Sequence, residues 1–127
     1  MKKFALLFAA ALAMSVFCVK FTHAADESGK SEKVTGILID DHCAAGMMKK
    51  DDPQAAAEKH KVACANKCIK GGASVVLISG KDELKLDSKG QDMAKEYLAK
   101  DDAKTKVTIT GEKSGDELKV TKIEAAE

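Results

Sequence analysis

The sequence predicts a mainly β domain of five short strands and two helices. Five segments rich in β-branched residues are separated by turn-forming residues, which is typical of short antiparallel strands. Their order is β-β-β-α-β-β, with one helix between the third and fourth strands. This is the order of a five-stranded OB-like barrel, a partly open Greek-key barrel. A second helix is expected as an insert between strands one and two.

The chain begins with a segment typical of a secretory signal peptide. Lys2 and Lys3 give a short positive region, residues 4–19 are apolar, and small residues at 22–24 precede the predicted cleavage site. The apolar run is short for a membrane-spanning helix, so we expect no membrane anchor once the leader is removed. Cys18 would be removed with it. The protein is therefore predicted to be exported, to a periplasm or to the exterior.

The remaining chain is predicted to be one small domain. We expect a signal peptide at 1–24, a flexible lead-in at 25–32, the OB-like domain at 33–124 with a helical insert at 40–72, and a tail at 125–127. Without the leader, 18 of the 21 basic residues remain against 20 acidic ones, so the formal net charge is −2. All four phenylalanines lie in the leader, and the chain contains no arginine. A surface with one tyrosine and no arginine argues against nucleic-acid binding.

The five strands follow from alternating or continuous apolar patterns. We predict them at 33–39, 73–79, 83–87, 106–111 and 117–123. Gly36, inside the first strand, predicts a bulge or a close approach of two backbones. A hairpin turn is expected at 80–82 and a second turn at 112–116.

Two helices are predicted between these strands. Asp52 and Pro53 are typical of a helix start, and Gly71 with Gly72 is typical of a helix end, so one helix is expected over 53–70. The shorter helix is expected over 91–100. On the longer helix, His60, Cys64 and Cys68 would follow one another at four-residue steps, each rotated by only about 40°.

The reactive side chains concentrate in the insert. Cys43 follows strand one, and His60, Cys64 and Cys68 lie on the predicted helix, so a metal site of these four residues is one hypothesis. Thiolate and imidazole are ligands that suit Zn²⁺ or Cu⁺. The alternates for this site are His42, Met47 and Met48.

A structural disulfide is the competing hypothesis for the same cysteines. Three cysteines remain after export, and thiols in an oxidising compartment are usually paired. Cys64 and Cys68 lie one helical turn apart, near the upper limit for a disulfide, so Cys43 would pair with Cys64 or Cys68. In that case the domain would be a disulfide-stapled structural module that binds a peptide or protein partner in the barrel groove.

An enzymatic function is not favoured. The main enzymatic alternative is thiol–disulfide exchange, which usually relies on C-x-x-C at a helix N-terminus. Here the spacing is C-x-x-x-C, and the pair lies near the predicted C-terminus of its helix, where the helix dipole opposes a thiolate. The preferred interpretation is therefore a non-enzymatic binding module for a soft transition metal.

The sequence also resembles a family of small exported bacterial domains of unknown function. The resemblance lies in the segments TGILIDDHC, CANKCIKGGASVVLI and VTITGEKSGDELKVTKIE, and it covers most of residues 34–124. It implies an OB-like fold and export. It implies no catalytic residues.

Overall fold

The computed structural model describes residues 30–127, so the predicted signal peptide and most of the lead-in lie outside the described residues. In chain order the elements are β1 (Glu32–Asp40), α1 (Asp41–Met47), α2 (Pro53–Glu58), α3 (Val62–Lys70), β2 (Val75–Ser79), β3 (Asp82–Leu86), α4 (Ser88–Leu98), β4 (Lys106–Ser114) and β5 (Glu117–Ala125). The prediction of a mainly β domain with five strands is confirmed.

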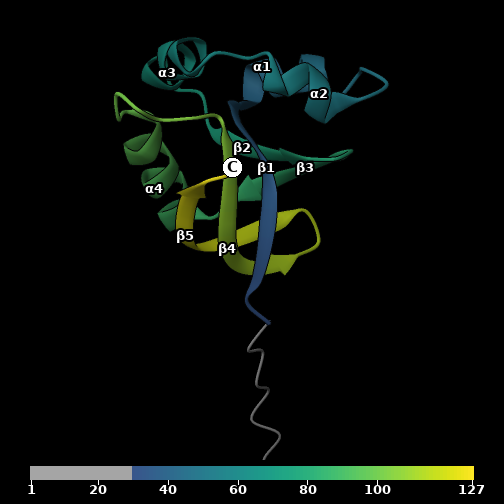
Figure 1. Ribbon diagram of the computed structural model, residues 1–127, viewed down its shortest axis with the longest axis vertical. Coiled ribbons are helices and arrows are strands. Elements are labelled where there is room, and N and C mark those ends of the chain that lie inside the picture. Colours follow the sequence, from purple (N-terminus) through teal and green to yellow (C-terminus); the bar gives the residue numbers. More distant parts are fainter. Residues whose placement is uncertain (1–29) are drawn as a thin grey trace, which may run out of the picture.

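The five strands form one mixed sheet in which each strand has two neighbours. The order is β1-β2-β3-β5-β4, and β4 pairs with β1 again. All pairs are antiparallel except the short β3–β5 pair. The ladder between β4 and β5 shifts register between Thr110 and Gly111. Figure 1 shows α1, α2 and α3 together at one end of this ring of strands, with α4 beside β5.

Two groups of apolar side chains stabilise the domain, one on each face of β1 and β2. Successive strand residues point to opposite faces, so Leu38 enters the larger group and its neighbours Ile37 and Ile39 enter the smaller one. Ala44 of α1 and Ala57 of α2 complete the smaller group. The insert therefore covers a sheet face that would otherwise be exposed.

The number of helices differs from the prediction, since there are four in the described residues and two were expected. The helix predicted over 53–70 is interrupted after Glu58, where Lys59 caps α2 and Lys61 adopts an extended conformation. No glycine or proline marks this break. Tertiary packing accounts for it, because α2 packs on the smaller apolar group and α3 packs Val62 on the larger one.

The first helix of the insert was not predicted at all. The side chain of Asp40 accepts a hydrogen bond from the backbone N–H of Cys43 at 2.9 Å, which caps α1 directly after β1.

The close approach predicted at Gly36 is confirmed, because a Cβ at this position would collide with the carbonyl oxygen of Ile78. Among the described helices, none has the length and apolar character needed to cross a membrane.

Candidate metal centre

The candidate site begins at the last residue of β1. Asp40 lies two residues after Leu38, so its side chain projects from the same face of the strand. It is fully buried, with 0% exposure. Its Oδ1 accepts the capping hydrogen bond of α1, whereas its Oδ2 has no hydrogen-bond partner. A buried carboxylate oxygen without a partner is costly, so it indicates a missing partner such as a proton donor or a cation.

The second residue of the site is His60, in the short link between α2 and α3. Its side chain is only 9% exposed, and its Nε2 lies 3.3 Å from Asp40 Oδ2. The pair is within ion-pair distance, yet Nε2 also lacks a hydrogen bond of acceptable geometry. Asp40 Oδ2 and His60 Nε2 are thus two buried polar atoms that face each other, and neither makes a hydrogen bond of acceptable geometry.

Cys43 completes a group of three metal-binding residues. One ligand atom each from Asp40, Cys43 and His60 can be chosen so that all lie within 4.8 Å of one another. Cys43 stands on the first turn of α1, and its half-buried side chain packs against the smaller apolar group. The three residues come from the end of β1, from α1 and from the α2–α3 link.

The surroundings of Cys43 and Cys68 oppose the thiolate form of both side chains. The pKa of Cys43 is raised from the usual 9.0 to about 11, chiefly by burial and then by the neighbouring Asp40 carboxylate and Cys68. The pKa of Cys68 is also raised, first by burial and then by Asp40. A bound cation would favour the thiolate form of both cysteines, because its positive charge attracts the negative sulfur.

The four predicted ligands do not lie together as expected. Cys43 and His60 meet in the site, and Cys68 of α3 lies beside it, since its side chain interacts with those of Cys43 and Asp40. Cys64 is exposed on α3. The predicted line of His60, Cys64 and Cys68 on one helix was wrong, because His60 precedes α3.

The predicted alternates lie outside the group. The side chain of His42 is 75% exposed, and its Nε2 is 3.8 Å from Asp41 Oδ1. Met47 and Met48 are partly buried and pack against the smaller apolar group. Asp40, by contrast, was not among the predicted ligands. Its position three residues before Cys43 is the sequence signal that could have identified it, because an Asp at a helix start faces the first turn.

The separation between the Asp40 and His60 ligand atoms matches the geometry of a tetrahedral metal site. With metal–oxygen and metal–nitrogen bonds of about 2.0–2.1 Å, two ligands at a tetrahedral angle lie about 3.3 Å apart. Asp40 Oδ2 and His60 Nε2 are separated by 3.3 Å. One ion placed between them would satisfy both orphaned atoms, with Cys43 supplying a third ligand.

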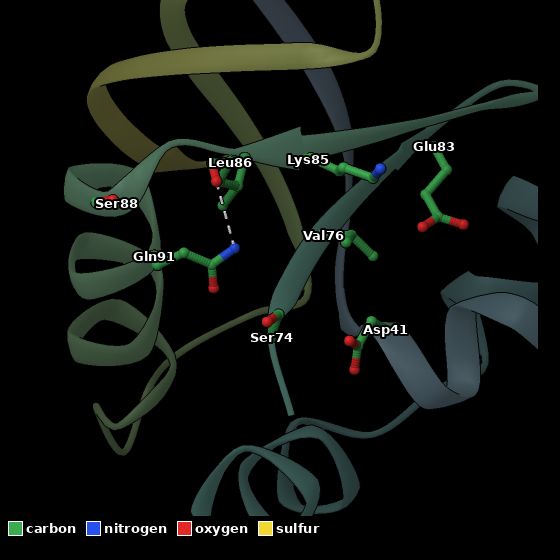
Figure 2. Close-up of a pocket in the computed structure, with 8 residues that line it drawn as sticks. All are labelled: Asp41, Ser74, Val76, Glu83, Lys85, Leu86, Ser88 and Gln91. Carbon is green, nitrogen blue, oxygen red and sulfur yellow. Dashed lines mark hydrogen bonds between the residues drawn. The ribbon is translucent and has the colours of Figure 1, made fainter. Parts of the chain in front are cut away.

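A separate surface cavity lies near the insert. Its volume is about 420 Å³, and Figure 2 shows it between α1, the strands β2 and β3, and the start of α4. Its lining is mixed: Asp41, Glu83 and Lys85 are charged, and Val76 is apolar. Gln91 is held at its edge, donating to the carbonyl of Val75 at 2.7 Å. The cavity is therefore an open site lined mostly by polar and charged residues.

Comparisons of the chain with protein-family models, with curated proteins and with solved structures return no match.

Proposed function

We propose that this chain is an exported, non-enzymatic binding module that holds a transition metal through Asp40, Cys43 and His60, with Cys68 as the fourth ligand. One observation carries the proposal. Asp40 Oδ2 and His60 Nε2 are buried, lack hydrogen-bond partners, and lie 3.3 Å apart beside the Cys43 thiol. Native proteins rarely leave such groups unpaired, and a metal ion pairs both at once.

The set of donor atoms favours Zn²⁺ over Cu⁺. A carboxylate oxygen, an imidazole nitrogen and thiolates are all ordinary zinc ligands, and four of them close a tetrahedral site. Cu⁺ prefers sulfur ligands, and a carboxylate adds little to its affinity. A site with four protein ligands has no open position for a substrate, which fits a binding function.

The strand order supports an OB-like barrel as the scaffold. The order β1-β2-β3-β5-β4, with a parallel β3–β5 pair and α4 between β3 and β4, agrees with the five-stranded Greek-key barrel. In that fold the connection between the first two strands borders the binding face. The proposed metal residues lie in or next to this connection. We also propose that the chain belongs with the small exported bacterial domains that its sequence resembles.

A disulfide-stapled interaction domain is the second candidate. The contact between the Cys43 and Cys68 side chains favours it, because a disulfide here would join α1 to α3. The cavity of about 420 Å³ on the β2–β3 side offers a place for a peptide or protein partner. The main enzymatic alternative, thiol redox catalysis, is opposed by the raised pKa of Cys43, since the thiolate is the nucleophile.

The metal proposal predicts tight binding of one Zn²⁺ by the reduced protein. Calorimetric titration of the purified protein should give a stoichiometry of one. Asp40→Asn, Cys43→Ser and His60→Ala should each weaken binding by more than the roughly 10–100-fold that follows loss of an outer-shell partner. Competition with Cu⁺ under reducing conditions tests the preference for zinc.

His42→Ala is the matched control for this titration. It removes an exposed imidazole of the same insert, so it should leave the affinity unchanged. Equal zinc binding by the wild-type protein and His60→Ala would refute the site. One free thiol per chain among Cys43, Cys64 and Cys68, with no bound metal, would instead support the disulfide-stapled domain.

A further inference from the structure

We propose that Cys43 and Cys68 form a reversible disulfide that excludes the metal, so the redox state of this pair switches the site between zinc-binding and zinc-free forms. The effect of the disulfide on zinc binding rests on the proposed function. The identity of the disulfide pair does not, since it concerns only which two cysteines join. The two candidate functions then become two states of one protein.

The identity of the pair follows from the orientation of α3. This helix packs Val62 and Ile69 against the larger apolar group and buries Ala65 fully. At 100° per residue, Cys68 lies at the flank of that buried face, whereas Cys64 is directed further toward solvent. Cys68 is accordingly half-buried and Cys64 exposed.

The contacts of Cys68 point to the same pair. The side chains of Cys43 and Cys68 interact with each other, and both are affected by the Asp40 carboxylate. Cys64 affects Cys68 but is not among the groups that affect Cys43. Of the two cysteines on α3, Cys68 is therefore the one whose side chain interacts with Cys43, and Cys64 remains as an exposed thiol.

The disulfide would exclude the metal because both need the sulfur atoms of Cys43 and Cys68. Zinc is bound by the thiolate form of cysteine, and a sulfur in a disulfide bond has no negative charge to offer. The disulfide would remove two of the four proposed ligands and leave Asp40 and His60. These two remain within ion-pair distance, 3.3 Å apart, but still without a hydrogen bond of acceptable geometry.

The oxidation needs an external disulfide, and we take a small-molecule disulfide such as oxidised glutathione. Its S–S bond breaks and the Cys43–Cys68 S–S bond forms, through a mixed disulfide. The two thiol protons pass to the two small thiols that are released. The protein is oxidised by two electrons, and the reagent is reduced by two.

The sequence allows the disulfide to be mapped with one protease. Trypsin cleaves after lysine, and Lys67 separates Cys64 from Cys68, so the three cysteines fall in peptides 34–49, 62–67 and 68–70. The metal-free reduced protein is incubated with oxidised glutathione, digested without reduction and analysed by mass spectrometry. We expect peptide 34–49 linked to peptide 68–70. A link from 34–49 to 62–67, or no link to 34–49, would overturn the assignment.

The metal arm uses the same sample. Stoichiometric Zn²⁺ added before the oxidant should slow formation of the disulfide at least about tenfold, because the bound thiolates are not free to react. The oxidised protein should bind Zn²⁺ at least about 100-fold more weakly than the reduced protein, since even outer-shell losses cost about 10–100-fold. A thiol reductant should restore the affinity.

Cys64→Ser is the matched control, because it removes the exposed cysteine of α3 and should change neither the disulfide nor its effect on zinc. If the reduced protein binds no zinc, the proposed function fails, while the mapped disulfide can still be judged. If reduced and oxidised proteins bind zinc equally, the switch is refuted, while the metal site survives.

Discussion

At the scale of single residues, the carboxylate of Asp40 has two structural effects. Its Oδ1 caps α1 by accepting the N–H of Cys43 at 2.9 Å, and its Oδ2 faces His60. It also contributes to the raised pKa values of Cys43 and Cys68, because a nearby negative charge opposes the formation of a thiolate. The protonation of the thiols and the pairing of His60 therefore depend on the same side chain.

Asp40→Asn should lower the pKa of the Cys43 thiol from about 11. Asparagine keeps the helix cap, but it removes the negative charge; burial, the larger cause, still keeps the pKa above its usual value. The thiolate then appears at lower pH, so alkylation of metal-free protein by iodoacetamide should accelerate at a lower pH in the variant. The rate is followed through the tryptic peptide 34–49.

Asp41→Asn is the control for that experiment, since Asp41 is not among the groups that shift the pKa of Cys43. It should leave the alkylation profile unchanged. Identical profiles for Asp40→Asn and the wild type would show that the carboxylate does not act on the thiol.

At the scale of secondary structure, the insert is three short helices that cover two different surfaces. α1 and α2 pack on the smaller apolar group, whereas α3 packs on the larger one. A single helix over 53–70 could not do both, because a straight helix presents one apolar stripe. The break between α2 and α3 also lets His60 turn inward toward Asp40.

Two glycines test how tightly these elements are packed. Gly36→Ala should destabilise the domain by roughly 1–3 kcal/mol, because the added Cβ would collide with the backbone of Ile78 across the β1–β2 pair. Gly46→Ala, in α1, should stabilise it by up to about 1 kcal/mol, because nothing lies within 4 Å of the added atom and alanine is the better helix former. Urea unfolding of both variants measures the difference.

A change in stability of the opposite sign at either glycine would contradict this packing. A destabilised Gly46→Ala variant would mean that α1 is not helical at this position. An unaffected Gly36→Ala variant would mean that β1 and β2 are further apart than described.

At the scale of the whole molecule, the proposed metal would join segments that are far apart in the sequence. Asp40 ends β1, Cys43 lies on α1, His60 links α2 to α3, and Cys68 is on α3. A ligand that binds only the folded state stabilises it by mass action. For a domain of this size, with a core of modest extent, the effect is large relative to its total stability.

Zinc should therefore raise the melting temperature of the reduced protein. At a free zinc concentration about 100 times the dissociation constant, the gain is about 2.7 kcal/mol, which corresponds to roughly 10–20 °C for a domain of about 100 residues. Differential scanning fluorimetry measures it, and a chelator should reverse it. His60→Ala should show no such increase, and the exposed-histidine variant His42→Ala should show all of it.

Much of the fold could be predicted from local patterns. Runs of β-branched residues predicted five strands near their observed positions. Asp52 followed by Pro53 predicted the start of α2, which begins at Pro53. That Cys43 and His60 lie close together could be expected from their positions in the sequence, since the insert holds most of the reactive side chains. Local patterns failed at the break before α3, because no residue there forbids a helix.

Interactions between near neighbours in the chain fix the strand pattern, the capped start of α2 and the segment that carries the reactive side chains, so these could be predicted from the residues. The residue pattern could not show that Asp40 joins Cys43 and His60, that Cys64 is exposed, or that the side chains of Cys43 and Cys68 interact. Burial and side-chain pairing depend on how α1 and α3 pack over the sheet. That packing is set by contacts between residues distant in the chain.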